Sequence, residues 1–176
     1  MPQQLIKDRA IIEDRWTLAR DAGAADSASS SGPVIVPLSA WKSRREELAV
    51  RGDIGVWLAP SEDPAELAGD IATLPLIAVD FPQFTDGRGY SIGRVLRERY
   101  GFTGELRAIG DVQQDQLYYL AQCGFNAFAI REDRKLEDAL TGLAAFSDGY
   151  QLTNTRTPWF RRRAEARAPE ARIPPE

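Results

Sequence analysis

Charged and hydroxyl side chains gather in one stretch of the sequence, residues 80–91. An apolar run at residues 76–79 ends at Asp80, a polar loop with two glycines follows, and Ser91 opens an amphipathic segment. This order predicts a strand, a loop and a helix. Ligands of parallel α/β proteins bind where the strands end. We therefore expect a ligand site here, although the residues do not specify a reaction.

The loop has the features of a site for a small oxyanion such as sulfate, sulfite or phosphate. Gly87 and Gly89 would let backbone N–H groups approach a ligand, and a helix that starts near Ser91 would add its positive end. Arg88 would supply a charge-assisted hydrogen bond. The same glycine spacing is also typical of a plain turn, which is the competing interpretation. The candidate ligand-binding residues, two of them at the ends of later strands, are Asp80, Thr85, Asp86, Gly87, Arg88, Gly89, Ser91, Asp111 and Arg131.

A carboxylate pair is a second hypothesis for the same stretch. Asp80 and Asp86 together would suit proton transfer or a hard cation such as Mg²⁺. Their spacing alone does not establish that the two side chains converge, and aspartates near strand ends also brace the backbone. The residues therefore assign no catalytic group and no enzymatic activity.

The absences in the composition are informative about cofactors. The chain contains no histidine, and Cys123 is its only cysteine. This excludes histidine-based acid–base catalysis, Cys-His dyads, nearly all zinc sites and a four-cysteine iron–sulfur cluster on this chain alone. The motif Gly87-Arg88-Gly89 lacks the third glycine of a dinucleotide-binding loop. We therefore expect no metal site and no evident cofactor, with Cys123 as a buried small hydrophobe.

The overall composition is that of an ordinary globular protein. The chain has 176 residues, of which 43% are hydrophobic and 27% charged, and its net charge is −4. A negative charge argues against nucleic acid as the main partner, and no apolar run approaches the roughly 20 residues that cross a bilayer. The first ten residues lack the apolar region of a signal peptide. We expect a cytoplasmic protein that binds neither membrane nor nucleic acid.

Five strands that alternate with helices are predicted to position the candidate residues. Each predicted strand is followed by a helical pattern, and Asp111 is predicted to cap the helix after the fourth strand. The expected strands are 34–38, 54–59, 76–80, 105–109 and 127–130, and the expected helices are 39–50, 63–72, from 91, from 111, and 136–143. This alternation indicates an α/β fold with a predominantly parallel sheet.

The favoured architecture is an open doubly wound sheet of about five strand–helix units. The alternative is a partial TIM-like β/α barrel that completes its sheet by dimerising, since five units are too few for a closed barrel. The domain prediction has three parts. Residues 1–33 form a short N-terminal β arm and a polar linker, residues 34–150 form the α/β domain, and residues 151–176 form a basic C-terminal tail.

Several stretches resemble an uncharacterised bacterial protein family that is usually encoded beside assimilatory sulfite reductase. The block DFPQFTDGRGYS within residues 74–101 is the most distinctive of them. The other stretches are DRWTLA (14–19), VIVPLSAW (34–41), GELRAIGDVQQDQLYYLAQCGF (104–125), FAIRED (128–133) and FSDGYQ (146–151). Members of the family are often labelled oxidoreductases of sulfite reduction.

The resemblance implies a role in sulfur assimilation. The expected function is an accessory protein that acts with sulfite reductase or its electron donor and binds a small oxyanion at the 80–91 loop. The alternative is a small oxidoreductase, or another enzyme of sulfite reduction, with a bound cofactor. A homodimer is a further expectation, because a partial barrel would be completed by a second copy.

Overall fold

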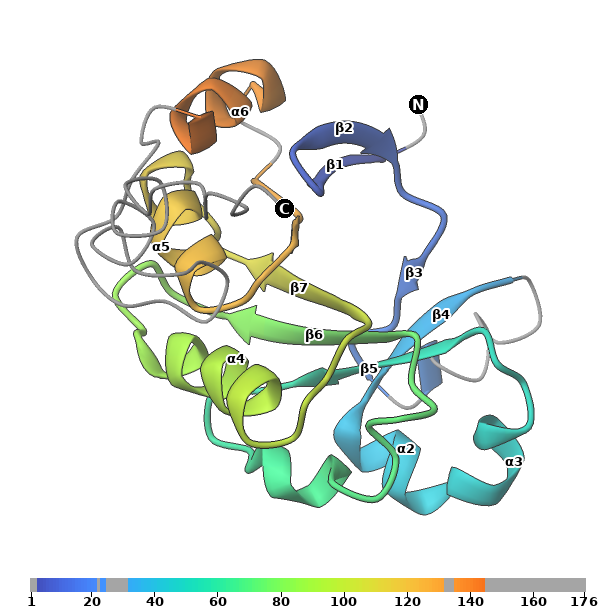
Figure 1. The fold of residues 1–176 in the computed structure, drawn as a ribbon. Coiled ribbons are helices and arrows are strands. Elements are labelled where there is room, and N and C mark those ends of the chain that lie inside the picture. Colours follow the sequence, from blue (N-terminus) through green and yellow to red (C-terminus); the bar gives the residue numbers. More distant parts are fainter. Residues whose placement is uncertain (1–2, 22, 25–31, 132–134, 145–176) are drawn as a thin grey trace, which may run out of the picture.

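A computed structural model describes residues 3–21, 23–24, 32–131 and 135–144 of the chain (Figure 1). The strands are β1 (Gln4–Lys7), β2 (Ala10–Glu13), β3 (Thr17–Leu18), β4 (Val34–Pro37), β5 (Ile54–Leu58), β6 (Leu76–Phe81), β7 (Glu105–Gly110) and β8 (Ala127–Phe128). The helices are α2 (Leu38–Ser43), α3 (Arg45–Ala49), α4 (Arg88–Glu98), α5 (Leu117–Gln122) and α6 (Leu136–Ala144), with short 3₁₀ helices η1 (Pro64–Leu67) and η2 (Gln114–Gln116).

The strands of the described residues form one mixed sheet of eight, in the order β2-β1-β8-β7-β6-β5-β4-β3. Strands β3 to β8 are parallel, whereas β1 is antiparallel to both β8 and β2. The prediction of an open doubly wound sheet with five strand–helix units is therefore wrong. From β3 to β8 the order never reverses, and a doubly wound sheet requires such a reversal.

The sheet curls into a half-barrel, and the connection between β2 and β3 explains why it must. These two strands form opposite edges of the sheet, yet only residues 14–16 separate them in the chain. That connection spans at most about 14 Å, whereas the edges of a flat eight-stranded sheet would be about 34 Å apart. The predicted alternative, a partial β/α barrel of predominantly parallel strand–helix units, shares the sequential order of β3 to β8 but not the antiparallel β1 and β2 in the same sheet.

The two faces of the sheet carry different residues because side chains alternate along each strand. On the outer face, Val56, Ile77 and Val79 pack in one core with helix residues such as Leu96 and Leu120. The inner, concave face carries a separate small cluster without helix residues, made of Ile35, Leu76, Ala78 and Ile109 with Trp16, Leu18, Trp57 and Ala129 around it. The described helices therefore cover one face of the sheet, whereas on the concave face Trp16, Leu18 and Trp57 pack against the small cluster.

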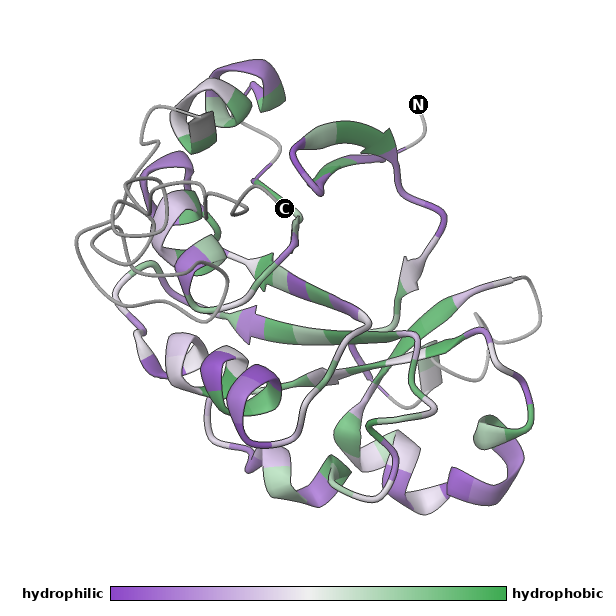
Figure 2. Ribbon diagram, in the orientation of Figure 1, coloured by the Kyte–Doolittle hydropathy of each residue, from purple (hydrophilic) through white to green (hydrophobic). Residues whose placement is uncertain are grey.

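The hydropathy of the helices agrees with this arrangement. Figure 2 shows α4 with its hydrophobic residues toward the sheet and its hydrophilic residues on the opposite side. Ile92 and Leu96 are the buried aliphatic residues of this helix. No helix in the described ranges is long and apolar enough to cross a membrane.

Individual strands match the sequence prediction more closely than helices do. The five predicted strands correspond to β4 to β8, and residues 4–13 form a β-hairpin where the short N-terminal β arm was predicted. Helix α4 begins at Arg88, three residues before the predicted start at Ser91, and the predicted helix 39–50 is divided at Arg44. The predicted tail, residues 151–176, lies outside the described residues.

Candidate functional site

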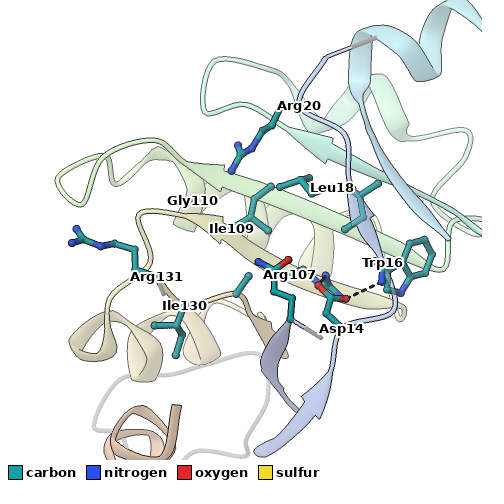
Figure 3. A pocket seen from close by; sticks show the side chains of 12 residues that line it. Asp14, Trp16, Leu18, Arg20, Arg107, Ile109, Gly110, Ile130 and Arg131 are labelled. Atoms are coloured by element: carbon teal, nitrogen blue, oxygen red, sulfur yellow. Dashed lines mark hydrogen bonds and ion pairs between the residues drawn. The ribbon is translucent and has the colours of Figure 1, made fainter. Parts of the chain in front are cut away.

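A pocket of about 260 Å³ lies on the concave face of the half-barrel (Figure 3). Its apolar lining comes from alternate residues of the inner face, including Ile35, Ile109 and Ala129. Its charged lining consists of three arginines and one aspartate. The complete lining is Gln3, Asp14, Trp16, Leu18, Arg20, Ile35, Arg107, Ile109, Gly110, Ala129, Ile130 and Arg131.

Arg20, two residues after β3, is held at one side of the pocket by two contacts. Its Nη1 donates a hydrogen bond to Asp80 Oδ1 at 2.8 Å, and its guanidinium lies 5.9 Å from the ring centroid of Trp57. The Trp57 indole is itself fixed, because Nε1 donates to the carbonyl of Ala19 at 2.9 Å. The Arg20 side chain is nevertheless 51% exposed. A planar cation is therefore oriented at the pocket while much of it faces solvent.

The position of the Asp80 carboxylate near the end of β6 requires a glycine, Gly110, on the adjacent strand β7. Gly110 has φ +96°, a conformation that residues with a side chain rarely adopt. A Cβ at this position would clash with the Phe81 carbonyl and stand 2.8 Å from Asp80 Oδ1. Gly110 thus permits the close approach of β6 and β7 where the Asp80 carboxylate is presented.

A second arginine–aspartate pair lies at the C-terminal ends of the parallel strands, as Asp80 does. Arg131 Nη1 donates to Asp111 Oδ1 at 3.0 Å, and Asp111 Oδ2 accepts from the backbone N–H of Phe84 at 3.1 Å. The hydrogen bond from Arg131 is the main reason that the pKa of Asp111 is lowered. Asp111 therefore joins the loop after β6 to the segment after β8. The predicted capping role of Asp111 is wrong, because η2 begins at Gln114 and Gln116 Oε1 accepts from Gln113 N–H.

Arg107 is the third arginine, and it is part of a buried ion-pair network. Its Nη1 donates to Asp14 Oδ2 at 2.8 Å, and its Nε donates to Glu105 Oε1 at 2.7 Å. Glu105 also pairs with Lys7 at 2.8 Å. The Arg107 side chain is only 3% exposed. This network attaches the N-terminal strands and the 14–16 connection to the centre of the sheet.

The loop that the sequence singled out has its own internal charge balance. Arg88 Nε and Nη2 donate to the two carboxylate oxygens of Asp86 at 3.0 and 2.7 Å. This hydrogen bonding is the main cause of the lowered pKa of Asp86 and the raised pKa of Arg88. Gly87 precedes α4, Gly89 packs against the Phe81 ring, and Ser91 is exposed on the helix.

The candidate residues from the sequence thus divide into two groups. Asp80, Asp111 and Arg131 belong to the edge of the concave pocket, either lining it or pairing with an arginine that does. The others lie in the loop before α4 or in its first turn, namely Thr85, Asp86, Gly87, Arg88, Gly89 and Ser91. Asp80 and Asp86 have different arginine partners, Arg20 and Arg88.

Sequence reasoning missed the N-terminal half of the pocket. Trp16, Leu18 and Arg20 alternate along β3 and its flanks and all line the pocket. That period of two was the available signal, together with the charge of Arg107 between the apolar residues Leu106 and Ala108 of a predicted strand. Among the described residues, no group of three or more histidine, cysteine, aspartate or glutamate side chains is arranged to hold a metal ion. The expectation of no cofactor stays a prediction.

Comparison with models of known protein families relates the chain to a bacterial family. The model of a bacterial protein family of unknown function, DUF934, matches residues 55–160. This range includes the Asp80–Ser91 stretch, β7 and β8, and it begins after Arg20. No curated protein matches the chain.

Proposed function

The chain belongs to the DUF934 family of bacterial proteins of unknown function, and we propose that it is an accessory protein of sulfur assimilation. In this proposal it acts with sulfite reductase or its electron donor and binds a small oxyanion in the concave pocket. The support for sulfur assimilation is the resemblance of the DFPQFTDGRGYS block to proteins encoded beside assimilatory sulfite reductase. The support for the ligand is the geometry around Arg20.

Arg20 is the single observation that carries the oxyanion proposal. A guanidinium has five N–H donors in a planar fork, which suits two oxygens of one anion. Among the described residues, Arg20 uses Nη1 for Asp80, and Trp57 lies against it. Arg88, in contrast, directs both Nε and Nη2 at Asp86. An oxyanion at Arg88 would have to displace that bidentate pair, so Arg20 is the better anion contact.

Titration of sulfite, sulfate and phosphate by calorimetry tests this proposal. A charge-assisted hydrogen bond is worth about 1.5–3 kcal/mol, so Arg20→Ala should weaken binding roughly 10- to 150-fold. Arg88→Ala is the matched control, because it also removes one exposed arginine paired with one aspartate. It should leave the affinity unchanged. If Arg88→Ala abolishes binding and Arg20→Ala does not, the 80–91 loop is the site and the pocket is not.

The partner part of the proposal needs a separate experiment. Sulfite reductase should co-purify with the tagged chain from a bacterium that assimilates sulfate, and it should not co-purify with an unrelated tagged protein. The absorption spectrum of the purified chain addresses the alternative. A flavin spectrum at one cofactor per chain, with no sulfite reductase in the eluate, would favour the small oxidoreductase and contradict an accessory role.

A further inference from the structure

We infer that the ligand of the concave pocket is an organic monoanion, with a sulfonate or carboxylate head at Arg20 and an apolar body along the inner face of the sheet. This inference rests on the proposed function for the anion contact at Arg20, and it replaces the bare oxyanion with a larger ligand that carries an anionic head. Three properties of the pocket support it, namely its size, its apolar surface and its charge balance.

The size of the pocket exceeds what a bare oxyanion fills. The volume is about 260 Å³, whereas one water molecule takes roughly 30 Å³ in the liquid. Sulfite or sulfate, with four or five non-hydrogen atoms, would leave most of that space to water. A ligand with a carbon skeleton would displace this water.

The apolar surface lies where the body of such a ligand would be. Leu18, Ile35, Ile109 and Trp16 all line the pocket. Figure 3 shows Ile109 between Arg20 and Arg107, with Leu18 and Trp16 to one side of them. Leu18 and Trp16 are only partly buried, so a ligand reaches them without opening the core. Each methylene that moves from water to such a surface raises affinity about fourfold. A bare inorganic anion gains nothing from these side chains.

The charge balance favours one negative charge on the ligand over two. Arg20 is already faced by Asp80, and the Asp80 side chain is only 13% exposed. Arg107 is faced by Asp14 and Glu105, and Arg131 by Asp111. A dianion such as sulfate would bring its second charge close to these carboxylates, which repel it. A sulfonate or carboxylate head carries a single charge for Arg20.

A series of ligands with one head and a growing body tests the inference. Methanesulfonate, butanesulfonate and benzenesulfonate are titrated into the full chain by calorimetry, with butanoate to compare the two head groups and sodium sulfate as the dianion. Because butanesulfonate adds three methylenes to methanesulfonate, its affinity should be up to roughly 60-fold higher. Sulfate should bind more weakly than butanesulfonate, and the tighter of butanesulfonate and butanoate identifies the head.

Two variants separate the apolar contact from general effects on the fold. Leu18→Ala should weaken butanesulfonate several-fold and leave methanesulfonate unchanged, with the urea midpoint as the check on folding. Ile12→Ala, on β2, the preceding strand in the chain, and outside the pocket lining, should change neither affinity.

The outcomes distinguish the inference from the proposed function. If all sulfonates bind equally, or sulfate binds tightest, the organic-ligand inference is overturned while an oxyanion site at Arg20 stands. If no anion, sulfite included, binds in an Arg20-dependent way, the oxyanion part of the proposed function fails and the inference fails with it.

Discussion

At the scale of single residues, Asp86 and Arg88 show how the charged groups of one loop can pair with each other and so be engaged before any ligand binds. Arg88→Gln should raise the pKa of Asp86 toward its ordinary value, because the hydrogen bond from Arg88 is the main cause of its lowering. A carboxylate with a lowered folded pKa stabilises the fold above its unfolded pKa of about 3.9, and this stability is lost as pH falls through the folded value. The variant and wild type should therefore differ at neutral pH and converge below about pH 4.

NMR titration of the Asp86 carboxyl carbon measures the pKa, and urea midpoints across the same pH range measure stability. Arg94→Gln is a suitable control, since Arg94 pairs with Glu98 on the outer surface of α4. An unchanged Asp86 pKa in Arg88→Gln would contradict the arginine as its cause.

Gly110 lies at the edge of the pocket in a conformation that a residue with a side chain rarely adopts. Gly110→Ala should destabilise the fold by about 1–3 kcal/mol, because it combines a positive φ with a clash against the Phe81 carbonyl. Gly87→Ala is the matched control. At Gly87 φ is −81°, and the nearest atom to a Cβ, on Tyr90, lies 3.8 Å away. Equal urea midpoints for the two variants would contradict this interpretation of the β6–β7 contact.

At the scale of elements, β7 and the N-terminal strands are joined by the buried charge network of Arg107. Arg107→Leu leaves the buried Asp14 carboxylate without its cation and Glu105 with Lys7 as its remaining cation. Loss of one partner of a buried ion pair costs about 3–5 kcal/mol. Arg94→Ala removes an exposed pair and should cost less than about 1 kcal/mol. Urea denaturation of both variants checks the difference, and a stability loss for Arg107→Leu as small as that for Arg94→Ala would contradict it.

The elements also show what local sequence patterns can and cannot predict. Strands β4 to β8 were predicted because each is a short apolar run that stands out within five or six residues. Arg20 was missed because its partner Asp80 is 60 residues away in the sequence. Arg88 and Asp86 are two residues apart, so their charges are visible as one local pattern. The doubly wound order was wrong for the same reason: strand pairing, like the Arg20–Asp80 contact, is decided by long-range packing.

At the scale of the whole molecule, the curl of the sheet depends on a connection of three residues. Residues 14–16 join the edges β2 and β3, and Asp14 holds that connection in place. Its Oδ1 accepts from the backbone N–H of Trp16 at 3.0 Å, and its Oδ2 accepts from Arg107 at 2.8 Å. The concave pocket is therefore formed by residues far apart in sequence, and one short segment brings its two sides together.

Asp14→Ala should loosen both edges of the sheet at once. Amide hydrogen exchange in β2 and in β3 should speed up together, although six strands lie between them in the sheet order. Strand β6 lies in the middle of that order, so its amides exchange through global unfolding and serve as the internal reference. The change in the edge strands should exceed the change in β6, because the variant releases the connection before it unfolds the core. Glu13→Ala, on the adjacent exposed residue, is the control and should change neither edge. Faster exchange in β2 alone would show that the two edges open independently. An equal change in all strands would show that they open only by global unfolding. In either case the three-residue connection would not be what keeps the half-barrel curled.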